Sequence, residues 1–86
     1  MELPFAMDKP ALKEFDLAAL REDLPSHGLR AGDVGTVVFV HGDGLAYEVE
    51  FMTADGRTIA VETLEAAQVE PLAGDQILHM RKLAAS

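Results

Sequence analysis

The sequence of 86 residues contains no cysteine and no tryptophan, and only one tyrosine. The absence of cysteine excludes disulfide bonds, thiolate nucleophiles and cysteine-based zinc sites, so packing must stabilise the fold. No apolar run approaches the ~20 residues that a membrane-spanning helix needs, and no positively charged start leads into an apolar run of signal-peptide length. We therefore expect a soluble, cytoplasmic protein without a membrane segment.

Basic residues are also scarce, with 7 Lys and Arg against 15 Asp and Glu, for a net charge of -8. Residues 32–72 carry eight of the acids and a single base, Arg57. Such a segment repels phosphate backbones and attracts basic partners. The hydrophobic content of 49% still predicts a folded domain. A chain of this length forms one small domain, which leaves little room for an enclosed active-site cavity.

The apolar residues predict an all-β domain. β-Branched, aromatic and alternating runs predict strands at 15–20, 34–41, 45–53, 58–64 and 69–72, with one helical turn at 65–68. Within 45–53 the alternation places Tyr47, Val49 and Phe51 in the core. Five short strands with a single helical turn before the last are typical of a small SH3-like barrel.

The chain divides into three parts around this barrel. Residues 1–11 form an extension in which Asp8 caps a short helical turn, after which Leu12 and Phe15 pack inward. Residues 12–72 form the barrel. Residues 73–86 form a tail with apolar residues at spacings of three, which favours a helix over a strand.

The turn before residue 58 predicts the pairing of the third and fourth strands. A three-residue loop ending at Gly56, with this glycine in the left-handed conformation, pairs Val49 with Val61. A two-residue turn would instead pair Val49 with Glu62 and mix apolar and charged residues on each face. We favour the three-residue loop, which sets Glu48 opposite Glu62, where like charges repel.

The preceding turn, HGDG at 41–44, is compatible with two loops. A three-residue loop sets Phe39 against Tyr47 and Val37 against Val49, whereas an even-numbered loop shifts this register. We favour the three-residue loop because it pairs apolar residues.

Two segments carry a family resemblance. LREDLPSHGLRAGDVGTVVFVHGDGLAYEVEF and TADGRTIAVETLEAAQVEPL resemble a family of small, uncharacterised bacterial proteins with an SH3-like barrel and an EDLP, HGL and GDVGTVV core. The resemblance covers about residues 12–72. It implies a stand-alone protein without known catalysis that pairs with neighbouring toxin-like proteins. More distantly, RAGDVGTVVFVHG is similar to the nitrile hydratase β-subunit barrel, where it helps to build a subunit interface, and to KOW motifs.

The candidate chemical motifs favour structural roles. The glycines of 32–35 lead into a strand, whereas a phosphate loop needs a lysine and a following helix. His41 and Asp43 share one turn but lack a third metal ligand. Ser26 and His27 are neighbours in a loop, where nothing orients the ring as a base. We expect no catalytic residues, no metal and no cofactor.

The hypothesis is a non-enzymatic protein-interaction module, an accessory or antitoxin-like protein that binds a basic protein partner. Three glutamates are expected on one outer face of the barrel, where a bound Arg or Lys would relieve their repulsion. Loops near this face supply further polar side chains. The expected partner-binding residues are Glu48, Glu50, Glu62, His27, His41 and Asp43.

Two alternatives stay open. A KOW-like protein would bind nucleic acid through Arg21, Arg30 and Arg57, but this chain has acids such as Asp33 and Asp43 where RNA-binding KOW domains usually carry bases. The chain would instead form a homo-oligomer if an exposed strand edge or the amphipathic tail associates with a second copy.

Overall fold

The computed structural model describes residues 12–72 and 74–83. Within these ranges the chain forms five strands and two short 3-10 helices: β1 (Leu17–Leu20), η2 (Pro25–His27), β2 (Val34–His41), β3 (Ala46–Met52), β4 (Thr58–Glu65), η3 (Ala66–Gln68) and β5 (Val69–Pro71). This confirms the prediction of an all-β domain with a helical turn before the last strand. None of the helices in these ranges is long or apolar enough to cross a membrane.

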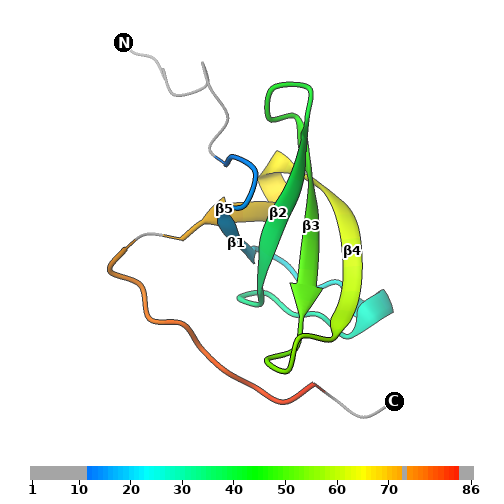
Figure 1. The fold of residues 1–86 in the computed structure, drawn as a ribbon, viewed down its shortest axis with the longest axis vertical. Helices are drawn as coiled ribbons and strands as arrows, with labels where there is room; N and C mark the ends of the chain where they lie inside the picture. The colour runs from blue at the N-terminus through cyan, green and yellow to red at the C-terminus, as the bar shows by residue number, and fades with distance from the viewer. Residues whose placement is uncertain (1–11, 73, 84–86) are drawn as a thin grey trace.

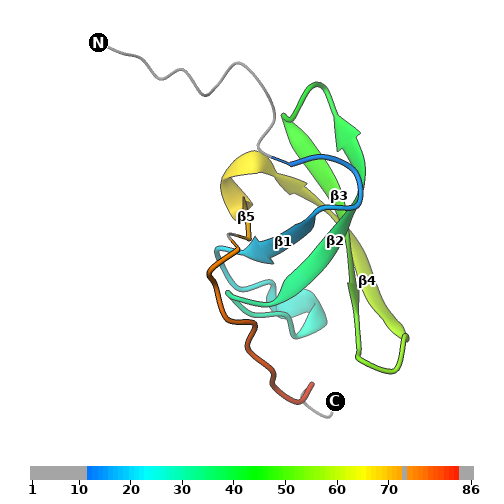
Figure 2. The ribbon, with the colours of Figure 1, turned by 60° about the vertical axis from the view of Figure 1, so that its left-hand side comes forward.

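The strands form one open antiparallel sheet in the order β4-β3-β2-β1-β5. The long strands β2, β3 and β4 lie side by side, and the short β1 connects β2 to β5 (Figure 1). Figure 2 shows that the sheet is curved, with β1 and β5 turned away from the plane of the three long strands. The curvature gives the sheet an inner face, which encloses the core, and an outer face.

The core lies on the inner face. The strand β3 contributes Tyr47, Val49 and Phe51, all buried as the alternation predicted. The other buried members of the apolar cluster are Leu12, Ala18, Leu20, Leu29, Val37, Leu64 and Val69. Tyr47 is therefore a core residue, and its ring is not available to a partner.

The pairing of β2 with β3 differs from the prediction at one end. The connecting loop has four residues, which is the even-numbered alternative, and the register shifts by one residue after Val37. Val37 faces Val49 as predicted. Phe39 faces Glu48 instead of Tyr47, so the three-residue loop and the Phe39–Tyr47 pair are wrong.

The physical reason is a bulge at Val38, which falls between the two registers. Val37 is buried and Val40 packs against the core, although residues three apart in a regular strand point to opposite faces. One extra residue between them lets both side chains reach the inner face. The apolar contacts of two valines thus decide the register, and the connecting loop has four residues instead of three as a result.

The loop between β3 and β4 is as predicted. Thr53 and Arg57 close a three-residue loop, since the Thr53 N–H donates to the Arg57 carbonyl at 2.8 Å. Gly56 has a φ of 89°, in the left-handed region that glycine enters without steric cost. Met52 then faces Thr58.

Beyond this first pair the prediction is wrong, because the register shifts between Phe51 and Met52. Val49 faces Glu62 instead of Val61, and Glu48 and Glu62 are not opposite each other. The repulsion expected between the two glutamates therefore does not occur. Glu62 shares the inner face with Val49, at the margin of the core.

A second bulge, at Ile59, accounts for this shift. Ile59 packs against the core, and Leu64 is buried opposite Tyr47. Positions 59 and 64 have opposite parity in a regular strand, so one extra residue is needed to bury both. The consequence is that Val61 points outward, contrary to the expectation.

Ahead of β1, Leu12 is buried as predicted, but Phe15 is not. Phe15 is 77% exposed with a φ of 73°. The carboxylate of Asp16 accepts the Lys13 N–H at 2.8 Å and closes a tight turn. In this turn the Phe15 N–H donates to the Val37 carbonyl, which directs the ring away from the core.

The two chain ends were expected to contain helical structure. The N-terminal extension 1–11 and its helical turn after Asp8 lie outside the described residues. The tail is described over 74–83 and contains no helix there, so that prediction is wrong. A helix this short has little stability of its own, and the Arg81 side chain is held by Asp33 in the domain.

Candidate functional site

The outer face of β2, β3 and β4 combines carboxylates with half-exposed apolar side chains. Phe39, Met52 and Val61 are 49%, 46% and 51% exposed. None of the three strands contains Lys or Arg. By the observed pairing, the residues of this outer face are Thr36, Phe39, His41, Ala46, Glu48, Glu50, Met52, Thr58, Val61, Thr63 and Glu65.

The Glu48 carboxylate is held in place by its neighbours on this face. Its Oε2 lies 2.9 Å from His41 Nε2 and accepts a hydrogen bond from the Thr63 hydroxyl at 3.2 Å. The His41 ring packs edge-on against Phe39, with 4.7 Å between ring centroids. The hydrogen bond with His41, together with the bond from Thr63, lowers the pKa of Glu48 below its ordinary value.

Glu50 is held in a similar way. The Thr58 hydroxyl donates to Glu50 Oε2 at 2.7 Å across the strand pair. Glu50 lies between Thr36 of β2 and Val61 of β4. The outer face therefore presents two oriented carboxylates beside apolar side chains.

Glu62 belongs to a different site, so the expectation that it joins Glu48 and Glu50 is wrong. Its Oε2 lies 2.5 Å from Nε2 of His27, at the end of η2. The pair connects the loop around η2 to the inner margin of β4. The bulge in β4 is the reason, because it moves Glu62 onto the inner face.

Asp43 stands apart from these pairs. It lies exposed in the loop between β2 and β3, with a φ of 59°. Aspartate tolerates this conformation better than most residues, which indicates a turn role. Within 12–72 and 74–83, no group of three or more His, Asp and Glu side chains could hold a metal ion.

A further cluster joins the tail to the domain. Arg81 Nε donates to Asp33 Oδ1 at 2.8 Å, and its Nη2 donates to Asp33 Oδ2 at 2.5 Å and to the Gly28 carbonyl at 2.9 Å. Both side chains are mostly buried by this contact. A two-pronged guanidinium–carboxylate pair is among the strongest polar contacts in proteins.

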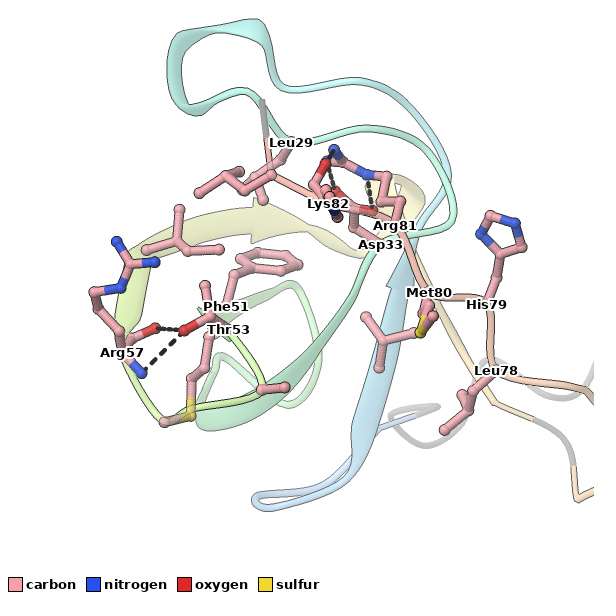
Figure 3. A pocket seen from close by; sticks show the side chains of 15 residues that line it. Leu29, Asp33, Phe51, Thr53, Arg57, Leu78, His79, Met80, Arg81 and Lys82 are labelled. Carbon is pink, nitrogen blue, oxygen red and sulfur yellow. Dashed lines mark hydrogen bonds and ion pairs between the residues drawn. The ribbon is translucent and has the colours of Figure 1, made fainter. Parts of the chain in front are cut away.

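Beside this pair lies a cavity of about 730 Å³ between the tail and the domain. Its domain side is mostly apolar, with Asp33, Thr53 and Arg57 as its polar members, and the tail forms the other side. Figure 3 shows Arg81 reaching Asp33 while Phe51 and Arg57 line the side away from the tail. The apolar lining from the domain consists of Leu29, Val34, Phe51, Met52, Ala54 and Ile59.

Comparison with known families decides where the chain belongs. Residues 14–71, more than half of the chain, match the family described as "Domain of unknown function (DUF4926)". The chain belongs to this family. Neither the curated proteins nor the solved structures contain a match.

The family match contains all of β1 to β5, whereas the tail lies beyond it. Asp33 and Gly28 are thus part of the family domain, and Arg81 is not. The outer face and both His–Glu pairs also lie within the match.

The Asp33–Arg81 pair was missed by sequence reasoning. Its members are 48 residues apart, and from the sequence Asp33 was interpreted as an acid that disfavours RNA binding and not as the partner of a base. One signal in the sequence indicates it, since the tail at 73–86 contains Arg81 and Lys82 against a single acid, Asp75. A basic tail after an acidic domain favours docking of the tail on the domain.

Acid should release the tail from Asp33. Burial raises the pKa of Asp33, but hydrogen bonds from Arg81 and from the Arg30 N–H, with the two arginine charges, outweigh it and lower this pKa below its ordinary 3.8. The contact is therefore fully formed above about pH 4 and is lost as the pH falls through the folded-state pKa. Amide NMR signals of residues 78–83 recorded from about pH 6 to pH 2 measure this loss.

Asp33→Asn supplies the control. In that variant the tail signals should show no transition below about pH 4, because the titrating carboxylate is gone. A transition that survives the substitution would contradict this assignment.

Proposed function

We propose that this chain is a non-enzymatic protein-interaction module that binds a basic protein partner through its outer face. The role is that of an accessory or antitoxin-like protein that escorts or neutralises the partner. Of the residues first expected to bind it, we keep Glu48, Glu50 and His41, and Phe39, Met52 and Val61 join them.

The observation that carries the proposal is the composition of the outer face. Two oriented carboxylates lie beside half-exposed apolar side chains, on three strands without a single Lys or Arg. Protein interfaces combine desolvated apolar contacts with charge complementarity, and the charge here selects a cationic partner. Such a partner would place Arg or Lys at Glu48 and Glu50.

The orientation of the carboxylates adds to this. His41 and Thr63 hold Glu48, and Thr58 holds Glu50, so little side-chain freedom is lost on binding. The low pKa of Glu48 keeps it ionised near neutral pH. Both features favour a charge-assisted hydrogen bond with a guanidinium or ammonium group.

The fold also supports an interaction role. The strand order β4-β3-β2-β1-β5, with η3 just before β5, is the arrangement we assign to an SH3-like barrel. The bases that nucleic-acid binding would use are partly engaged, since Arg21 donates to the Val69 carbonyl at 3.1 Å and lies near Glu70. This favours a protein partner over the KOW-like alternative.

Affinity capture with paired variants tests the proposal. Glu48→Gln together with Glu50→Gln should abolish capture of the specific partners that the unchanged chain retains, because both charge-assisted contacts are lost. Partners are identified by mass spectrometry and then measured individually as purified proteins. The expected loss in affinity is at least about tenfold, since both charge-assisted contacts are removed.

Glu14→Gln with Asp75→Asn is the matched control, because it also removes two negative charges, at exposed positions outside the outer face. This control should capture the same partners as the unchanged chain. Equal capture by the outer-face variant would overturn the proposal. Capture that disappears after nuclease treatment would assign the face to nucleic acid instead.

A further inference from the structure

Asp33 and Gly28 form an acceptor site whose position does not depend on the tail. Asp33 Oδ2 accepts the Arg30 N–H at 2.8 Å, and the Asp33 N–H donates to the Arg30 carbonyl at 2.9 Å. Gly28 ends η2 with a φ of 69°, and its N–H donates to the Pro25 carbonyl. The carboxylate and the carbonyl are thus positioned by the 25–33 loop itself.

The guanidinium of Arg81 fills this acceptor site, but the rest of the tail fits poorly. Leu78 and Met80 are 62% and 93% exposed, although both lie at the cavity that apolar side chains of the domain also line. The tail therefore satisfies the polar subsite and leaves the apolar one open. The other residues of 74–83 are exposed, so the contact of Arg81 with Asp33 and Gly28 is the main buried contact that detachment of the tail must break.

The chemistry of the site selects arginine. The carboxylate accepts two parallel N–H groups, and the Gly28 carbonyl accepts a further hydrogen bond from Nη2. A lysine ammonium cannot reproduce this planar arrangement. The adjoining lining includes the half-buried side chains of Val34 and Ile59, which suit apolar residues next to the arginine.

We propose that Asp33 and the Gly28 carbonyl form a binding site for an arginine-bearing, apolar-flanked segment of a protein partner, and that Arg81 occupies this site until the partner displaces it. The site lies in the family domain, and its present occupant lies beyond the family match. This inference does not depend on Glu48 and Glu50 of the outer face, although the two surfaces meet at Met52.

A peptide supplied in trans tests the proposal. The probe is the synthetic peptide QILHMRKL, the sequence of residues 76–83, added to the full-length Arg81→Gln variant. Binding should shift the amide NMR signals of Gly28, Asp33 and Val34. The unchanged chain should bind at least about tenfold more weakly, because its own tail occupies the site most of the time.

Three controls identify the chemistry. The peptide with glutamine in place of its arginine should produce no shifts, and Arg81→Gln with Asp33→Asn should lose binding of the unchanged peptide. Arg81→Gln with Glu48→Gln and Glu50→Gln should bind as Arg81→Gln does, which separates this site from the outer face.

Two outcomes would overturn the proposal. The first is a failure of the peptide to shift these signals in Arg81→Gln, or equal binding of the peptide that lacks arginine. The second is a dimer of the unchanged chain in sedimentation that Arg81→Gln dissociates, because the occupant would then be the tail of a second copy.

Discussion

Replacing Gly35 by alanine is expected to destabilise the domain by about 1–3 kcal/mol. A Cβ at this position would lie 2.6 Å from Val49 Cγ1, 2.8 Å from the Glu50 carbonyl oxygen and 2.9 Å from Phe51 Cδ1. The first and third atoms belong to buried core side chains. The second belongs to the backbone of β3, which cannot move without disturbing the pairing of β2 with β3.

Urea denaturation followed by circular dichroism measures this effect. Gly74→Ala is the matched control, because a Cβ there meets no atom within 4 Å, and it should leave the midpoint nearly unchanged. A Gly35→Ala midpoint equal to that of the control would show that β2 and β3 can separate freely at this point. With a stability of about 5–15 kcal/mol typical of a domain, the expected loss is a large fraction of the total.

Sequence patterns predicted the two strands that meet at Gly35. Alternation in β3 predicted its buried face, and the apolar run at 34–41 predicted β2 with its bounds. Both signals are local, because side chains alternate between the two faces within a single strand. The helical turn before β5 was predicted from residues 65–68, which is also a local signal.

Register was less predictable, because it depends on residues that compete for the core. Val37 and Val40 both need the inner face, and so do Ile59 and Leu64. Each pair has a spacing that a regular strand cannot satisfy, and the chain resolves each conflict with a bulge. Turn rules alone favour regular pairing, and they therefore placed Val61 inside.

The error in register carried over to the candidate site. Glu62 was expected beside Glu48, but it pairs with His27, whereas Glu48 pairs with His41. All four residues were selected from the sequence, but the two pairs that they form were not predicted. A one-residue shift in strand register moves a side chain to the other face of the sheet. Contacts between distant segments, such as Asp33 with Arg81, have no local pattern at all.

Leu12→Ala is expected to have the largest effect on stability, a loss of about 2–5 kcal/mol. Leu12 is 1% exposed and belongs to the core cluster, although it precedes β1 and the family match at 14–71. Truncation to alanine removes buried methyl groups and leaves a cavity in the core. The core of this domain therefore extends beyond its strands.

Urea denaturation midpoints of Leu12→Ala and Leu45→Ala compare the same substitution at a buried and at an exposed leucine. Leu45 is 76% exposed in the loop between β2 and β3, so its truncation should change the free energy of unfolding by no more than about 0.5 kcal/mol. Equal midpoints for the two variants would contradict the assignment of Leu12 to the core. A larger loss of stability in Leu12→Ala than in Leu45→Ala would support the assignment of Leu12 to the core. A fragment that starts at residue 14 would then lack a core side chain and should be less stable than the full chain.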